Sequence, residues 1–158
     1  MFLGVKRAYT LLFLYIMEVI EELGSQPAFD ILMKAVEKQG EMIAKEIKTQ
    51  IPAELSLLEV GAEVYRLFMV DVGSEVSIYK KNEKSITFLI HRCPFHEAYL
   101  DVGVDCGIFL KGLCSSFTVP AIQATLMQFD NRLRIENLVT RDSSEGVCLE
   151  RVYLMDTP

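Results

Sequence analysis

The first part of the chain is dominated by apolar residues at helical spacing. Between Val5 and Leu23 they are so dense that they would cover most of a helix circumference, which predicts a helix covered on several sides. Three interpretations stay open for it: a buried core helix, a homodimer seam, or attachment to a membrane surface. Gly24 is a typical helix stop, and Ser25 with Pro27 restarts the chain as a helix N-terminus does.

Two further helices are expected before the pattern changes. From Ala28 to Thr49 the apolar residues keep near-helical spacing with charges between them, which predicts a second, amphipathic helix. Pro52 interrupts this pattern. From Leu55 to Val72 apolar positions recur at three- and four-residue steps, which predicts a third helix.

Beyond Gly73 apolar and polar residues alternate, and two such runs are separated by the polar residues 81–84. This pattern predicts a β-hairpin. Pro94 cannot donate to a strand ladder, so the second strand is expected to end just after Cys93. The alternating apolar positions are Val76 and Ile78 in the first strand, then Ile86, Phe88 and Ile90 in the second.

The remaining pattern predicts helices over residues 102–116 and 120–128, followed by strands over 133–140 and 147–155. The order of elements indicates one α+β domain over residues 1–158, with an antiparallel sheet of about four strands packed against several helices. Within it, residues 1–50 form an N-terminal helical segment at a predicted dimer seam, and residues 51–158 form a ligand-binding α+β core.

The net charge and the charges that flank the first apolar run limit the partners and the cellular location that we expect for the protein. The formal net charge is −6, which argues against a broad nucleic-acid surface. Lys6 and Arg7 before the apolar run imitate the start of a signal peptide, but acidic residues follow at once and no small-residue cleavage site appears. The run is also too short for a transmembrane span. We therefore predict a cytoplasmic protein with reduced cysteines.

Thiol and imidazole side chains are zinc ligands. The chain has four cysteines and two histidines, and the cysteines are Cys93, Cys106, Cys114 and Cys148. No C-x-x-C pair is present, so the alternative is that these are free cysteines that pack as small apolar residues. If Cys106 and Cys114 share one helix they lie about 12 Å apart, too far for one zinc. Cys106 is favoured over Cys114 as the zinc ligand, because Cys93 and His96 could turn back to meet it near a helix start.

A hydrolytic alternative uses the same residues differently. Cys93 or Cys106 would be the nucleophile, His96 its base, and Asp101 or Asp105 the group that orients the base. No phosphate-binding loop is present among the glycines.

The segments CPFHEAYLDVGVDCGIFLKGLCSSF and RIENLVTRDSSEGVCLERVYL resemble the four-vinyl reductase domain, a small-molecule-binding family, and the related aminothiazoline-carboxylate hydrolases. Cys106 with Gly107 resembles the start of a Gly- and Phe-rich helix in these families, and Glu136 with Cys148 resembles their closing hairpin. The resemblance covers roughly residues 55 to 155. One departure is that the cysteine expected between Glu136 and Cys148 is absent.

The resemblance implies a domain that binds aromatic or hydrocarbon molecules, in some members beside zinc, on a fold similar to that of vesicle-tethering subunits. The implied zinc ligands are Cys93, His96, Cys106 and Cys148. The implied ligand pocket lies between sheet and helices, with candidate residues Phe88, Phe109, Leu110, Phe117, Met127 and Glu136.

We therefore predict a small-molecule-binding domain with a sensory or regulatory role, a small apolar or aromatic ligand, and a zinc ion. A thiol- or zinc-dependent hydrolase of a small cyclic amide-like substrate is the first alternative. A metal-free protein-interaction module of vesicle-tether type is the second.

Overall fold

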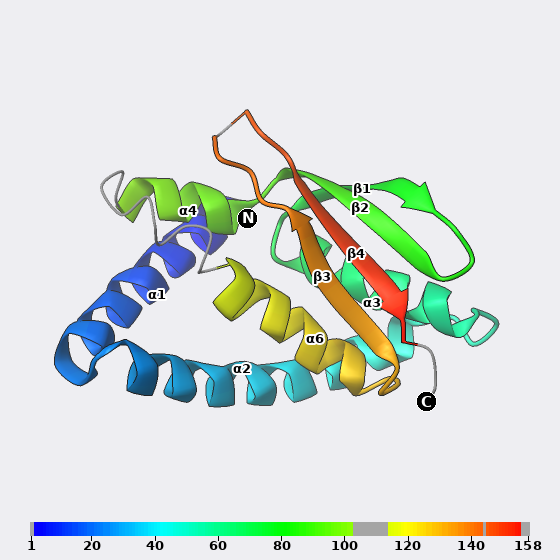
Figure 1. The fold of residues 1–158 in the computed structure, drawn as a ribbon, viewed down its shortest axis with the longest axis horizontal. Helices are drawn as coiled ribbons and strands as arrows, with labels where there is room; N and C mark the ends of the chain where they lie inside the picture. The colour runs from blue at the N-terminus through cyan, green and yellow to red at the C-terminus, as the bar shows by residue number, and fades with distance from the viewer. Residues whose placement is uncertain (1, 103–113, 144, 156–158) are drawn as a thin grey trace.

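The computed structural model describes residues 2–102, 114–143 and 145–155, which form an α+β fold (Figure 1). Four antiparallel strands make one sheet in the order β1-β2-β4-β3. The predicted fold class and sheet are confirmed. The strands are β1 Glu75–Lys81, β2 Ser85–Arg92, β3 Leu133–Val139 and β4 Cys148–Leu154.

The helices cover one face of the sheet and extend beyond it (Figure 1). The three helices expected before the hairpin are present, and the one expected near residue 120 is α6. The helices are α1 Phe2–Leu23, α2 Ser25–Ile47, α3 Leu57–Asp71, α4 Pro94–Val102 and α6 Val119–Met127, with a 3-10 turn at Lys48–Gln50 and a π-helical turn at Cys114–Thr118.

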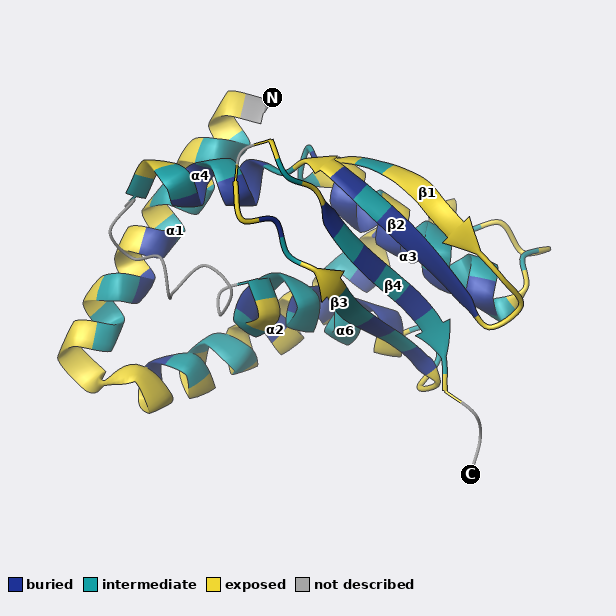
Figure 2. Cartoon of the chain, turned by 45° about the horizontal axis from the view of Figure 1, so that its top comes forward, coloured by how far each residue is buried: buried dark blue, intermediate teal, exposed yellow. Residues whose placement is uncertain are grey.

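Helix α1 is not the buried core helix that its apolar density suggested. Phe13 and Ile16 are buried, but Leu11 is 69% exposed and Tyr15 65%. The chain reverses between α1 and α2 at Gly24, whose φ of 82° lies in the left-handed region that favours glycine. Within this chain, α1 therefore buries one side only (Figure 2).

Helix α3 begins at a capping pair. The Glu59 carboxylate accepts hydrogen bonds from the backbone N–H of Ser56 (3.1 Å) and from its hydroxyl (2.7 Å). This S-x-x-E spacing is a known start signal for helices. It fixes the helix start close to the predicted residue 55.

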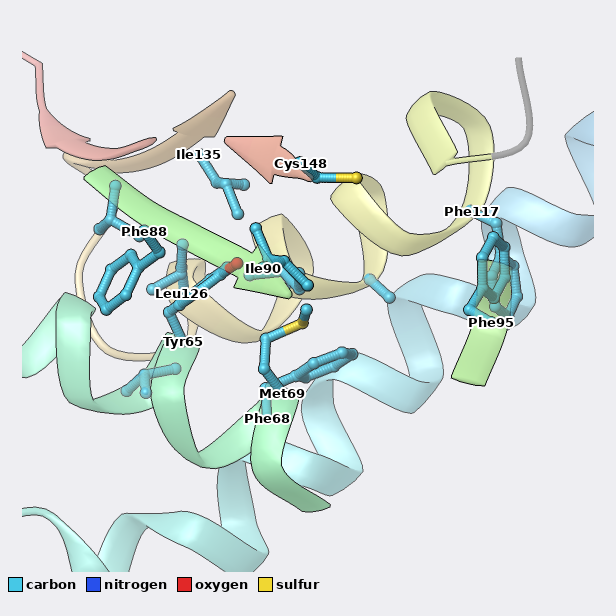
Figure 3. Packing of buried hydrophobic residues seen from close by; sticks show 14 of the residues in the cluster. Tyr65, Phe68, Met69, Phe88, Ile90, Phe95, Phe117, Leu126, Ile135 and Cys148 are labelled. Atoms are coloured by element: carbon cyan, nitrogen blue, oxygen red, sulfur yellow. The ribbon is translucent and has the colours of Figure 1, made fainter. Parts of the chain in front are cut away.

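Helices α3 and α6 lie against the sheet and α2 packs on α6. A Cβ on Gly40 of α2 would come within 2.8 Å of the Ala124 backbone, so the glycine permits this close approach. Tyr65 of α3 packs on Phe88 of β2 with ring centroids 4.4 Å apart. Side chains from helices and sheet thus form one apolar core (Figure 3).

Residues 94–102 are a helix, although the alternation pattern indicated only the end of a strand. Pro94 is the first residue of α4, a position where its missing N–H costs nothing. Most of the helix expected over residues 102–116 lies outside the described residues. The described part, from Cys114, is a π-helical turn that leads directly into α6.

Candidate functional site

A cavity of about 50 Å³ lies where the end of β2 meets the helices. Its walls come from α1, α2, α3, the start of α4 and the turn before α6. The lining residues are Tyr9, Gln39, Ile43, Phe68, Met69, Val72, Ser74, Cys93, Phe95, Phe117, Thr118 and Ala121.

Cys93 immediately precedes helix α4, and its thiol faces the helix N-terminus. The sulfur accepts hydrogen bonds from the backbone N–H groups of Phe95 and His96, which favour the thiolate. Burial has the larger effect and raises the pKa of the Cys93 thiol above its usual value. The nearby Glu150 carboxylate acts in the same direction. The thiol is therefore held in its protonated form at neutral pH.

Two buried hydroxyl groups line the same cavity without a hydrogen-bond partner among the described residues. They are the Oγ of Ser74 and the Oγ1 of Thr118. Ser74 Oγ makes no hydrogen bond of normal geometry, but it lies near enough to the Cys93 sulfur to lower the pKa of that thiol. A buried unsatisfied hydroxyl costs about 1–3 kcal/mol. A water molecule or a polar group of a ligand could remove this cost.

Aromatic rings form the opposite wall. Phe95 and Phe117 stack with centroids 5.4 Å apart and planes inclined by 7°, while Tyr9 meets Phe95 edge-on at 5.3 Å. The stacked pair stands at the helix end of the core, apart from Tyr65 and Phe88 (Figure 3). Burial, and to a lesser extent the Cys93 thiolate, raises the pKa of Tyr9 to about 12. The cavity therefore joins an aromatic wall to polar groups.

A buried polar cluster lies next to the cavity, beneath the sheet. Glu150 of β4 is buried and accepts a hydrogen bond from the Tyr65 hydroxyl at 2.6 Å. Burial raises the pKa of Glu150, against the lowering effects of Tyr65, Asn137 and Arg141. Sequence reasoning missed Glu150, although a signal was present: Glu150 lies between Cys148 and Val152 at two-residue steps, which places all three on one face of the strand.

Arg141 connects the β3–β4 turn to the end of β2. Its guanidinium is buried and donates hydrogen bonds to the carbonyls of Ile90 (2.6 Å) and His91 (3.0 Å). Its Nε donates to the Cys148 sulfur at 3.3 Å. Burial, and then the Arg141 charge, lowers the pKa of His96. Arg141 is thus a second functional candidate that sequence reasoning did not single out.

The structure gathers some of the predicted zinc ligands but not all. Cys93 lies at the cavity with buried His96 one helical turn away, and Cys148 faces the core under Arg141. Burial mainly raises the pKa of Cys114, and the thiolates of Cys93 and Cys148 add to this. Cys106 lies outside the described residues. Within the described ranges, no three His, Cys, Asp or Glu side chains are placed to share a metal ion.

The predicted ligand-binding residues fall in different places. Phe117 lines the cavity, whereas Phe88 packs in the core against Tyr65. Met127 is 49% exposed and borders a separate surface depression. Glu136 lies on the opposite face of the sheet from Cys148, where Arg151 donates to it at 2.6 Å. Phe109 and Leu110 are outside the described residues.

The described carboxylate of the predicted hydrolytic site is engaged elsewhere. Asp101 pairs with Lys6 of α1 at 2.9 Å. Asp105 lies in the part of the chain that the structure does not describe. The described residues therefore contain a thiol and an imidazole at this site, but Asp101 is not positioned to orient His96.

Comparisons with known proteins extend this picture. A family model described as L-2-amino-thiazoline-4-carboxylic acid hydrolase matches residues 5–124. The crystal structure of the phenol-responsive sensory domain of the transcription activator PoxR with phenol has a similar fold, with a TM-score of 0.61 and 11% sequence identity. The similarity covers 92% of this chain and 74% of that one. No match was found among curated protein sequences.

The helices that the structure describes were also compared with the length and apolarity of a bilayer-crossing segment. None of them is both long and apolar enough to cross a membrane.

Proposed function

Because the chain belongs to the L-2-amino-thiazoline-4-carboxylic acid hydrolase family, we propose that its cavity at Cys93 is a small-molecule site, and that the protein is a ligand-binding domain with a sensory or regulatory role. The ligand is a small apolar or aromatic molecule with a polar end. The similarity in fold to a phenol-responsive sensory domain supports this choice of ligand.

The observation that carries the proposal is the pairing of unsatisfied hydroxyls with an aromatic wall in one cavity. A ligand such as phenol could place its ring beside Phe95 and Phe117 and its hydroxyl near Ser74 or Thr118. The cavity volume, about 50 Å³, is smaller than the roughly 150 Å³ of a cavity known to admit benzene. Binding of a ring therefore requires side-chain movement, for which the flexible Met69 in the wall is suited.

Phenol binding to the full chain, measured by calorimetry, tests this proposal. Thr118→Val removes one unsatisfied hydroxyl at nearly constant volume. We therefore expect the free energy of unfolding to rise by about 1 kcal/mol and phenol binding to weaken. Thr125→Val is the matched control, because the Thr125 hydroxyl is also buried but is satisfied by the Ala121 carbonyl at 2.9 Å, and Thr125 itself does not line the cavity. It should leave phenol affinity unchanged. Equal phenol affinity in wild type and Thr118→Val would contradict the proposed site.

We place this domain in the cytoplasm, where reduced cysteines are expected. The sequence features that argue against a signal peptide support this location. Fractionation of cells that express the protein tests it, and recovery from a membrane or secreted fraction would contradict it.

The zinc ion expected from the sequence is a separate proposal that depends on Cys106. Its support within the described residues is that Cys93 follows three residues after Ile90, the β2 residue that pairs with Cys148. The Arg141 guanidinium opposes it, because its Nε already donates a hydrogen bond to the Cys148 sulfur. Elemental analysis should find about one zinc per chain, lost in Cys106→Ser and retained in Cys114→Ser. Metal-free wild-type protein would exclude the zinc site.

A hydrolase is the second candidate, favoured by the placement of the Cys93 sulfur at the N-terminus of α4. Helix N-terminal N–H groups stabilise thiolates, and thiolates are the nucleophilic form. The raised pKa of Cys93 argues against it at neutral pH. Hydrolysis of L-2-amino-thiazoline-4-carboxylic acid, abolished by Cys93→Ala in a folded protein and increasing toward alkaline pH, would favour the enzyme over the binding domain.

We also propose that the exposed apolar side of α1 is a homodimer seam. Its largest exposed apolar side chains include Leu11, Leu14 and Tyr15, and an apolar groove between α1 and α2 continues this surface. Exposed apolar side chains that adjoin an apolar groove are typical of an interface.

A further inference from the structure

The exposed side of α1 carries a regular stripe of residues. Arg7, Leu11, Leu14 and Glu18 are all exposed and follow one another at steps of four, three and four residues. This spacing places them on one side of the helix. Exposed residues run along α1 in Figure 2. The stripe has two leucines at its centre, a positive charge on the N-terminal side and a negative charge on the C-terminal side.

We propose that the partner of this stripe is the α1 helix of a second copy, packed antiparallel across a two-fold axis between Leu11 and Leu14. This inference deepens the proposed dimer seam and rests on it. In a two-fold interface the same patch faces itself. Leu11 of each copy then packs on Leu14 of the other.

The charges are complementary in this arrangement. Arg7 lies four residues before Leu11 and Glu18 lies four residues after Leu14, so the axis that pairs the leucines also places Arg7 opposite Glu18 of the second copy. The interface contains this ion pair twice. One step further out, exposed Gly4 lies opposite exposed Glu21, and a glycine leaves room for the longer side chain. A parallel pairing would bring like charges together instead.

The acidic C-terminal end of α1 is electrostatically unfavourable in a single copy. The first turn of α1 has no acidic residue and the last turn has no basic one, while Glu21 and Glu22 lie in that last turn. Acidic groups at a helix C-terminus oppose the helix dipole. Arg7 and Glu18 of one helix are about 16 Å apart and cannot pair with each other. An antiparallel second copy brings its Arg7 and the positive N-terminal end of its own α1 toward these acidic residues, which a neutral lipid surface does not.

Charge reversal in the full chain tests this geometry, with sedimentation analysis as the readout. Arg7→Glu and Glu18→Arg should each weaken dimerisation about tenfold, because each reverses two contacts at once. The double variant Arg7→Glu/Glu18→Arg should restore wild-type dimerisation. Glu46→Lys, an exposed charge reversal near the end of α2, is the control and should have no effect.

The outcomes separate this inference from the proposals it rests on. Restoration in the double variant supports the antiparallel pairing, since the two residues cannot interact within one helix. A dimer that is insensitive to both single variants overturns the pairing and points to another interface. A wild-type protein that stays monomeric at 100 µM, or binds phosphatidylcholine–phosphatidylglycerol vesicles as a monomer, overturns the seam itself. Phenol affinity of the same variants reports separately on the cavity.

Discussion

At the scale of single residues, Arg141 is the side chain that holds the polar groups beneath the sheet in place. It joins two backbone carbonyls at the end of β2 to the Cys148 sulfur on β4, so one side chain holds together segments that are distant in sequence. A buried guanidinium is tolerated where its nitrogens find acceptors, and its planar fork can reach several acceptors at once.

We predict that Arg141→Lys lowers the free energy of unfolding by about 2 kcal/mol, because an ammonium group cannot reproduce three directed hydrogen bonds. Urea unfolding followed by circular dichroism measures the change. Arg132→Lys is the control, since Arg132 is exposed and pairs with Asp130 on the surface. Equal stability of Arg141→Lys and wild type would show that the charge alone is sufficient.

Glu150 should make stability depend on pH. Burial raises the pKa of Glu150 in the folded state above the ordinary 4.5 of the unfolded chain. Between the unfolded-state pKa and the folded-state pKa, the folded state keeps a proton that the unfolded state releases. Stability must then fall as the pH rises through this interval. Glu150→Gln mimics the protonated form and should remove this part of the dependence. Unfolding free energies at pH 4.5 and 7.5 test it, with the more exposed Glu136→Gln as control.

Only part of the site could be predicted at this scale. Cys93 and Phe117 were identified because their residue types and neighbours were suggestive, and both line the cavity. Glu136 was chosen because of its place in a family pattern, and Glu150 was not considered. The two-residue alternation of β3 and β4 turns Glu136 away from Cys148 and turns Glu150 toward the core. The strand register decides which of the two carboxylates faces the core, and register depends on pairing between strands that are distant in sequence.

At the scale of elements, the start of α4 shows why helix boundaries were harder to predict than helices. Pro94 can end a strand and can equally well begin a helix. The alternation of apolar residues before it indicated only the end of the strand. The consequence for the site is direct, because the helix start supplies the N–H groups that surround the Cys93 sulfur.

The start of α3 gives a prediction for a helix cap. Ser56→Ala should lower the free energy of unfolding by about 1 kcal/mol. It should also raise the pKa of Glu59, now held at about 2 chiefly by the Ser56 hydroxyl and then by Lys81. That low pKa means that the cap contributes stability above pH 4.5 and loses it as the pH falls toward 2. NMR titration of the Glu59 carboxyl measures the pKa.

Ser25→Ala is the matched control for this cap. Ser25 is an exposed serine at the start of α2, but the N-terminus of that helix has no side-chain cap hydrogen bond. Stability should therefore change little. An equal loss in both variants would mean that serine propensity, and not the Ser56–Glu59 pair, explains the effect.

At the scale of the whole molecule, the number and type of strands could be predicted, but their order could not. β4 inserts between β2 and β3, and the alternation of apolar residues along each strand does not specify that order. The same is true of α1: its apolar density predicted a helix and left its surroundings open. In the structure it has an inner side at the cavity, with Tyr9, and an outer side with Leu11 and Leu14.

Because α1 contributes both to the cavity wall and to the proposed dimer seam, ligand binding and dimerisation should be linked. A second copy that fixes α1 also fixes Tyr9 in the cavity wall, so part of the ordering needed for ligand binding is already complete. Linkage is reciprocal, and phenol must then strengthen dimerisation by the factor by which dimerisation strengthens phenol binding. Calorimetry at protein concentrations below and above the dimer dissociation constant should give tighter phenol binding at the higher concentration. Leu11→Glu, which introduces like charges at the seam, should bind phenol with one concentration-independent affinity. Equal wild-type affinities at both concentrations would show that the two sides of α1 act independently.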